Sequence, residues 1–271
     1  MTVNDWLWIG FYGMALGAAA LLAYGWSYRT RDEENHAYLH LFVCLAAMAS
    51  YLAMATGYGS VRLADGRDFY FARYVDWSVT TPLLLLGLSL TALHSPFRRW
   101  ALLLGLLFTD VYMIVTGLFA GLSPTGSAAK WTWYLISSGA FLFIYYALFG
   151  PLRREAGLTG ARAAALFKRN ATVLAVLWFG YPVIFLLGDE GVRSVGPVGT
   201  AAAYTILDLL AKVAFGLFSL SGTKAKTTAE LADGEVAEHD KRPAAMAYHE
   251  VHAPGRNERT APEVVRPKAR R

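Results

Sequence analysis

Charge and cysteine are both scarce in this chain of 271 residues. Only 17% of the residues are charged, whereas soluble domains average about 25%. The single cysteine, Cys44, excludes an intramolecular disulfide and offers no metal cluster. No CxxC, HExxH, Walker or GxGxxG pattern occurs in a usable context. The sequence therefore gives no reason to expect a disulfide-rich domain, a bound metal or a nucleotide-binding fold.

Long apolar runs take the place of charge, and 55% of the residues are hydrophobic. Each run is about 20 residues or longer, which is enough to cross a bilayer as a helix. None shows the alternation of apolar and polar residues that is typical of a membrane barrel strand. We therefore predict an all-α integral membrane protein, a bundle of seven transmembrane helices, at residues 5–28, 36–58, 70–92, 100–122, 129–149, 161–188 and 197–222.

The distribution of basic residues predicts the orientation of this bundle. If the N-terminus is outside, the cytoplasmic connections carry nine basic residues and the outer connections four, in agreement with the positive-inside rule. The first five residues hold no basic side chain, so we expect the first span to be kept as a helix and not cleaved as a signal peptide. We accordingly predict a multi-pass protein of the plasma or inner membrane, with a cytoplasmic C-terminus.

The last part of the chain differs in composition from the spans. Residues 223–271 mix both signs of charge with Pro and Ala and hold few large apolar side chains. Such a segment buries too little surface to order itself, so we predict a disordered cytoplasmic tail after a membrane domain at residues 1–222. The net charge of +5 arises from the loops and this tail and does not indicate nucleic-acid binding.

Two opposite charges lie near the middle of the last span. Asp208 and Lys212 are four residues apart, about one helical turn, so they share one helix face. A lysine at this depth is costly unless it has a partner and a function. A desolvated amine can condense with a carbonyl to form a Schiff base, and a carboxylate can hold the resulting cation. The alternative is an ion pair that only joins two helices.

The third span holds a second group of polar residues. Arg73, Asp76 and Thr80 follow at spacings of three and four, and therefore lie on one helix face. With Asp208 and Lys212 they would form a cluster of two positive and two negative charges, which a low dielectric could tolerate. The sequence thus predicts that these two spans meet around one buried site.

Three motifs identify a family that this chain resembles. They are R-Y-x-D-W-x-x-T-T-P-L-L-L-L in the third span, W-x-x-Y-P at Trp178, Tyr181 and Pro182 in the sixth, and D-x-x-x-K in the seventh. In this order and at these helix depths, they resemble the motifs of the microbial rhodopsins. The resemblance covers all seven predicted spans and leaves out only the tail.

The resemblance implies a chromophore and the residues that hold it. All-trans-retinal would be bound covalently to Lys212 as a protonated Schiff base, with Asp76 and Asp208 as its counterions. Arg73 would lie just to the extracellular side and balance their charge. The residues at the family's pocket positions are Trp77, Thr80, Leu84, Met113, Gly117, Trp133, Ser137, Phe141, Trp178, Tyr181 and Phe185.

The resemblance also discriminates between kinds of transport. Chloride-pumping relatives lack an acid at the Asp76 position, and sodium-pumping relatives carry Asn there and Asp at the Thr80 position. The Asp–Thr pair therefore favours a light-driven outward proton pump, an ion transporter rather than an enzyme, with Asp76 as the proton acceptor. Proton pumps of the best-known type hold a carboxylic donor eleven residues after the acceptor, where this chain has Gly87. The alternative is a sensory photoreceptor with a slow photocycle.

His40 is a candidate for the missing donor. By alignment it neighbours the usual donor position on the cytoplasmic side, and imidazole titrates near neutral pH. It would relay a proton towards Lys212, with Gly87 leaving room for it or for water. The alternatives are that His36 and His40 are helix-end residues in the headgroup zone, or that His40 helps only through water.

Two acids after the sixth span bear on proton release. Glu190 matches one of two release carboxylates of the haloarchaeal pumps, and the second position is Thr200. Glu190 is thus a possible release group; alternatively, Glu190 and Asp189 are exposed loop acids.

Further positions predict contacts and partners. We expect the buried carboxyl of Asp110 to bond to Thr81 across two helices, because buried polar groups need partners. Antenna-binding relatives carry glycine where this chain has Tyr134, so no carotenoid is expected. The other expected partners are the lipid bilayer and further copies of the chain, in a trimer or a pentamer.

Overall fold

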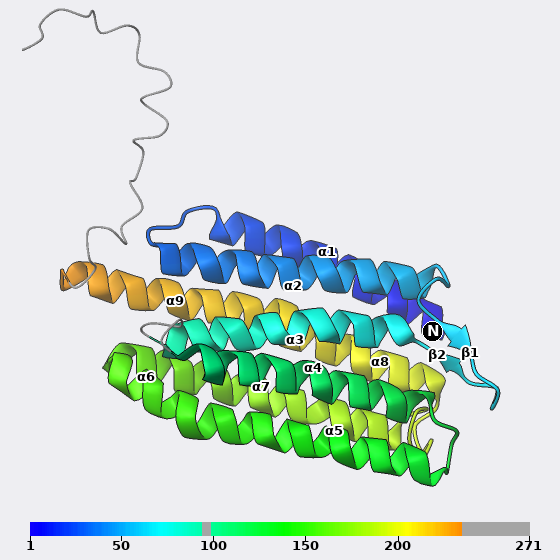
Figure 1. Ribbon diagram of the computed structural model, residues 1–271. Coiled ribbons are helices and arrows are strands. Elements are labelled where there is room, and N and C mark those ends of the chain that lie inside the picture. Colours follow the sequence, from blue (N-terminus) through cyan, green and yellow to red (C-terminus); the bar gives the residue numbers. More distant parts are fainter. Residues whose placement is uncertain (94–98, 235–271) are drawn as a thin grey trace, which may run out of the picture.

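The computed structural model describes residues 1–93 and 99–234 and consists mainly of long helices packed side by side (Figure 1). Seven helical stretches in this part of the chain are long and apolar enough to cross a membrane, which confirms the predicted bundle. The elements are α1 Val3–Gly25, α2 Arg31–Ala55, β1 Val61–Arg62, β2 Asp68–Phe69, α3 Phe71–Ala92, α4 Trp100–Leu122, α5 Ala128–Ala147, η2 Leu148–Leu152, α6 Arg153–Thr159, α7 Ala161–Leu187, α8 Pro197–Asp208, η3 Leu209–Ala214 and α9 Phe215–Ala232.

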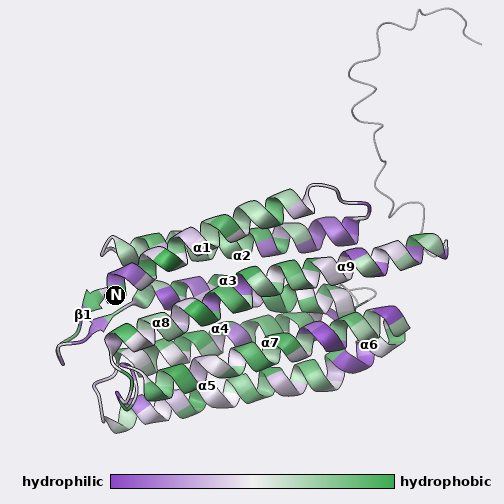
Figure 2. Cartoon of the chain, turned by 180° about the vertical axis from the view of Figure 1, so that it is seen from behind, coloured by the Kyte–Doolittle hydropathy of each residue, from purple (hydrophilic) through white to green (hydrophobic). Residues whose placement is uncertain are grey.

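The spans run alternately in opposite directions, so the bundle has two distinct ends (Figure 1). We name them the hairpin end, which holds the N-terminus and the β1–β2 hairpin, and the α9 end, where α9 finishes. Hydrophobic colours dominate along the helices, and hydrophilic ones gather at the start of α2 and the end of α9 (Figure 2). This distribution is expected when the middle of each helix faces lipid or the core.

The hairpin is fastened to the neighbouring helix end by charged hydrogen bonds. Arg67 donates to Asp65 at 2.8 Å and to the carbonyl oxygen of Gly121, at the end of α4, at 3.2 Å. Burial alone would raise the pKa of Asp65, but hydrogen bonds from Arg67 and Thr125 outweigh it and lower the pKa to about 2. Asp65 therefore stays charged at any ordinary pH and keeps the hairpin in place.

Close packing of α1 against α2 depends on a glycine. A Cβ atom at Gly10 would lie 2.2 Å from Cε1 of Tyr51, a distance that no side chain could tolerate. The missing side chain lets the Tyr51 ring lie between the helices, buried, with its hydroxyl directed to Asp208. Packing at α1 thus supports the polar cluster in the middle of the bundle.

The last helix is longer than the seventh predicted span, which ended at residue 222. Helix α9 continues to Ala232, because Thr223 and Thr227 are buried against the bundle and Lys226 pairs with Asp32 at 2.9 Å. The composition of the segment beyond residue 222 is typical of disorder and did not indicate these contacts. The remainder of the predicted tail, from residue 235, lies outside the described residues.

Candidate functional site

Lys212 lies at the centre of the bundle, in a short stretch of π-helix. Its side chain is only 1% exposed, and its Nζ atom lies 2.8 Å from Oδ1 of Asp208 and 2.5 Å from Oδ2 of Asp76. The π-helical stretch η3, Leu209–Ala214, interrupts the regular helix at this residue, a feature that is frequent at functional sites. The predicted meeting of the third and seventh spans is therefore present in the structure.

The two carboxylates beside Lys212 differ in how they are held. Asp208 accepts hydrogen bonds from Tyr51 at 2.8 Å, Tyr181 at 2.8 Å and Trp77 at 3.3 Å, in addition to Lys212. Asp76 accepts from Lys212, while its Oδ1 is buried without a partner in the described chain. Hydrogen bonds to a carboxylate favour its charged form. Asp208 is thus fixed as an anion, whereas Asp76 has an oxygen available for a proton.

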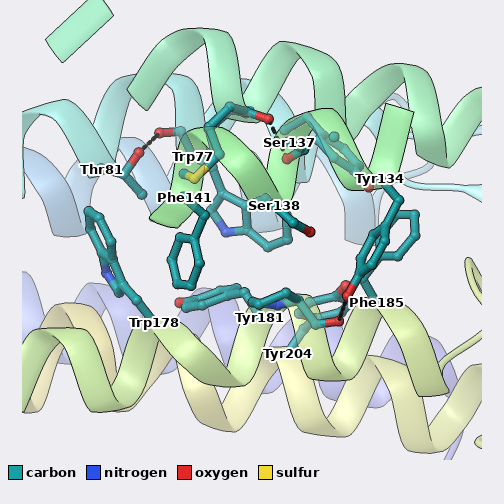
Figure 3. A pocket seen from close by; sticks show the side chains of 15 residues that line it. Trp77, Thr81, Tyr134, Ser137, Ser138, Phe141, Trp178, Tyr181, Phe185 and Tyr204 are labelled. Carbon is teal, nitrogen blue, oxygen red and sulfur yellow. Dashed lines mark hydrogen bonds between the residues drawn. The ribbon is translucent and has the colours of Figure 1, made fainter. Parts of the chain in front are cut away.

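A cavity lined by aromatic and small side chains lies beside this cluster (Figure 3). Residues from α3, α4, α5, α7 and α8 form its walls. At Gly117, an added Cβ would lie 3.4 Å from Oγ of Ser137, so glycine leaves room at this wall. Eight of the predicted pocket residues line the cavity: Trp77, Met113, Gly117, Ser137, Phe141, Trp178, Tyr181 and Phe185.

The cavity and the lysine are joined through Asp208. Trp77 and Tyr181 both line the cavity, and both donate to the same oxygen of Asp208 that accepts from Lys212. The amine therefore lies directly behind the cavity wall. An amine held between two carboxylates, next to an apolar and aromatic cavity, fits an elongated apolar cofactor with a carbonyl at one end.

Three further predicted pocket residues, Thr80, Leu84 and Trp133, are absent from the lining of this cavity. Thr80 and Leu84 are buried on α3 but do not line the cavity, and Thr80 donates to the backbone of Asp76 at 2.9 Å. The ring of Trp133 packs against Phe119 of α4, with centroids 5.1 Å apart.

Tyr134, the residue after Trp133 on α5, lines the cavity. Its hydroxyl donates to the Pro182 carbonyl at 3.2 Å, and its ring stacks on Phe185, so the side chain turns towards α7. The prediction also missed other lining residues: Tyr74, Thr81, Ile114, Ser138, Pro182 and Tyr204.

The predicted bond between α3 and α4 is present. Thr81 donates to Oδ2 of Asp110 at 2.6 Å, and Asp110 is fully buried. This confirms the expected contact of the buried acid with a hydroxyl across two helices. Thr81 also lines the cavity (Figure 3), so its hydrogen bond to Asp110 holds one of the wall residues in place.

The hairpin end of the site is formed around Glu190, which the structure buries. Its side chain is 8% exposed, forms an ion pair with Arg73 at 3.4 Å and accepts a short hydrogen bond from Tyr74. Buried Lys130 donates to the backbone oxygen of Glu190 at 2.7 Å. The interpretation of Glu190 as an exposed loop acid is therefore wrong, because the loop folds inwards onto α3 and α5. Asp189 of the same loop is partly exposed.

On the other side of Lys212, α2 carries a row of polar residues that leads to the α9 end. Asp32, His36, His40 and Cys44 follow at intervals of four residues, so each is one turn, about 6 Å, beyond the last. Both histidines are buried within the bundle, so neither side chain is exposed at its surface. The part of this row nearest Lys212 borders on its helix, since a Cβ at Gly216 would lie 3.2 Å from Cβ of His40.

The two histidines have different surroundings. His40 packs edge-on against Phe215, and neither of its ring nitrogens has a hydrogen-bond partner in residues 1–93 and 99–234. His36 instead contacts the Gly87 carbonyl at 3.2 Å and Thr91 Oγ1 at 3.0 Å through Nε2. His36 thus meets the backbone of Gly87, whereas a Cβ atom at Gly87 would lie 3.8 Å from Cδ1 of Leu39.

Comparison with known proteins agrees with this geometry. The family model described as bacteriorhodopsin-like protein matches residues 1–225. The chain belongs to the bacteriorhodopsin-like family. It is 42% identical to a bacteriorhodopsin of Haloterrigena sp. (strain arg-4) over 79% of this chain and 86% of that protein.

Solved structures of the family superpose on most of the chain. A thermophilic rhodopsin from Rubrobacter xylanophilus has a TM-score of 0.80 at 39% identity, over 83% of this chain and 98% of the other. A light-driven proton pump from Leptosphaeria maculans has a TM-score of 0.73 at 31% identity, over 82% and 96% of the two chains. This family member is therefore a multi-pass membrane protein, and its family implies a retinal chromophore.

The residues present fit that chromophore. Lys212 offers the amine, Asp76 and Asp208 offer the negative charge, and the aromatic cavity offers an apolar wall. In the described part of the chain, no group of three or more His, Cys, Asp or Glu side chains could hold a metal ion.

Proposed function

We propose that this protein is a light-driven outward proton pump, with all-trans-retinal bound to Lys212 and the hairpin end facing outside. One observation carries the proposal: Lys212 Nζ lies between Asp208, a carboxylate with four hydrogen-bond donors, and Asp76, whose Oδ2 accepts from Lys212 and whose Oδ1 has no partner within the described residues. Retinal, when bound there, would supply light absorption and an isomerisation that lowers the proton affinity of the lysine nitrogen. Acceptance, release and return of the proton would be carried out by the protein's own side chains.

Asp76 is the proton acceptor in this scheme. Its Oδ2 is the carboxylate oxygen nearest to Lys212 Nζ, and the proton can move along that 2.5 Å contact. Asp208 keeps its charge because Tyr51, Tyr181 and Trp77 would each lose a good acceptor if it were protonated. In this scheme Asp76 therefore takes the proton, and Asp208 keeps the negative charge of the site.

Release would pass towards the hairpin end through Arg73 and Glu190. Arg73 lies over the ring of Tyr204, 4.3 Å from its centroid, and pairs with Glu190 beyond it. A proton on Asp76 leaves Arg73 without that negative charge nearby, which favours its contact with Glu190. Thr200 is buried and donates to backbone carbonyls, so Glu190 acts without a second acid at that position.

Return of a proton to Lys212 would come from the α9 end, along the α2 row. His40 borders the last span at Gly216, and His36 lies one turn further from Lys212, in contact with the carbonyl oxygen of Gly87. We propose that His36 stores the proton and that His40 passes it on. A trimer or pentamer in the membrane remains part of the proposal.

Illumination of cells tests the proposed function. Cells that express the chain with retinal should acidify an unbuffered medium in light, because each cycle moves a proton outwards. An uncoupler should abolish the pH change, since it lets protons return across the membrane. A coloured protein that leaves the pH unchanged would favour the sensory photoreceptor, and alkalinisation would reverse the proposed direction.

Time-resolved absorption tests the return step. We expect His40→Ala to slow recovery of the protonated Lys212 nitrogen by about 100-fold or more, the usual range for removal of one proton-transfer group. Small weak acids should restore the rate, because they can deliver a proton through the space that the imidazole leaves. Recovery of the protonated Lys212 nitrogen should be slowed in the same way in His36→Ala. Recovery at the unmodified rate in the His40 variant would remove His40 from the mechanism.

A further inference from the structure

Beyond His36, the α2 row ends in a cluster of charges at the surface, built from α2 and the extended α9. Asp32 is 34% exposed, and its carboxylate lies 3.2 Å from Nδ1 of His36 and 2.9 Å from Nζ of Lys226. Lys226 is 17% exposed and lies 3.7 Å from Glu230, one turn further along α9. Exposure therefore falls from Asp32 to the buried ring of His36, so this is where the row meets water.

The contacts of His36 favour a ring that carries two protons. Nδ1 lies 2.9 Å from the carbonyl oxygen of Asp32, and Nε2 lies 3.2 Å from that of Gly87. Carbonyl oxygens only accept hydrogen bonds, so each ring nitrogen meets its carbonyl best as an N–H donor, and the Thr91 hydroxyl, 3.0 Å from Nε2, can accept as well. The carboxylate of Asp32 adds a negative charge on the same side, which the imidazolium form needs in a buried place.

Lys226 opposes the stabilisation of the His36 imidazolium by Asp32, because its positive charge lies beside the same carboxylate. It competes with His36 for Asp32, and its Coulomb interaction with an imidazolium is repulsive. The other groups facing His36 are Thr91 and the Gly87 carbonyl of α3, which carry no charge, and His40 on its own helix, which has no acid partner in the described chain. The balance between Asp32 and Lys226 is therefore the main electrostatic influence on His36.

We propose that Asp32 and Lys226 are positioning residues that set the proton affinity of His36, and thereby the pH range in which the protein takes up its proton from the α9 side. The inference rests on the proposed function for its second half, and on the geometry alone for its first. The part of α9 beyond the predicted span then has a role, because it supplies Lys226.

Two substitutions should shift the titration of His36 in opposite directions. Asp32→Asn removes the negative charge that stabilises the imidazolium, so the pH midpoint should fall by about one unit. Lys226→Met removes the repelling positive charge, so the midpoint should rise by roughly half a unit or more. Lys226→Arg keeps the charge and should restore the original midpoint. A merely structural role would not give shifts of opposite sign.

The matched control is Lys224, two residues earlier on the same helix. Its Nζ donates to the carbonyl oxygens of Tyr24 at 2.6 Å and Ser27 at 3.4 Å. Lys224→Met removes the same charge from the same helix without touching Asp32, so it should leave the midpoint within about 0.2 units. High salt should reduce the shift in the Asp32 variant, because that carboxylate is partly exposed to screening ions.

The measurement is a titration of the full-length protein in the dark by ¹⁵N-histidine NMR, with the His36 signal assigned by its loss in His36→Gln. Shifts of the same sign in Asp32→Asn and Lys226→Met, or no shift in either, would overturn the inference. The dark titration needs no transport, so it decides the inference even if illumination produces no acidification. Should the dark midpoints move while the pH profile of the return step does not, His36 is excluded as the uptake group and the second half of the inference fails.

Discussion

Replacing Lys212 by alanine is expected to give a protein without colour. The Lys212 amine can bond to an aldehyde covalently, and it lies directly behind the wall of the aromatic cavity. Without it, retinal has no bond to the protein and no cation for Asp76 and Asp208 to stabilise. The visible absorption band and light-driven acidification should both be lost completely.

Controls separate loss of the bond from loss of the fold. Lys212→Ala leaves two buried carboxylates facing each other, a situation that costs several kcal/mol. The double variant with Asp76→Asn removes one of these charges and should fold while remaining colourless. Lys130→Ala, which removes another buried lysine at the hairpin end, should keep the pigment. Borohydride reduction should fix the chromophore's mass to a peptide that contains Lys212; the same mass on any other peptide would overturn the site.

Replacing Asp76 by asparagine is expected to stop transport and shift the colour to the red. Asparagine is neutral and cannot take a proton from Lys212, so the outward step has no acceptor. The carboxylate stabilises positive charge at the nitrogen, and light moves that charge away along the chromophore. Loss of the carboxylate therefore raises the ground state more than the excited state, and the absorbed photon carries less energy.

Asp110→Asn is the matched control for this prediction. Asp110 is also a fully buried acid in a span, but its carboxylate accepts from Thr81 rather than Lys212. Asparagine can accept the same hydrogen bond, so this variant should still acidify the medium and keep a colour near that of the unmodified protein. Light-driven acidification by Asp76→Asn at the unmodified rate would show that a different group accepts the proton.

The local sequence pattern was enough to predict the membrane spans and the central residues of the site. Helical periodicity placed Asp208 and Lys212 on one face, and the structure finds them 2.8 Å apart. The same argument put Arg73, Asp76 and Thr80 together on α3, because spacing along one helix fixes direction irrespective of the rest of the fold. The outer limits of the spans were less certain, and α9 in particular runs on to Ala232.

Contacts between helices were decided by the tertiary structure, because they depend on the rotation of each helix about its axis. That rotation turns Tyr134 rather than Trp133 to the cavity, and brings His36 rather than His40 to Gly87. A tyrosine hydroxyl within an apolar span needs a partner, but the sequence does not say that the partner of Tyr51 is Asp208, 157 positions away. Loop packing likewise buries Glu190, since the stability of a buried acid rests on partners from other elements. The sequence by itself determined which chemical groups lie in the membrane and at what depth; only packing decided which of them touch.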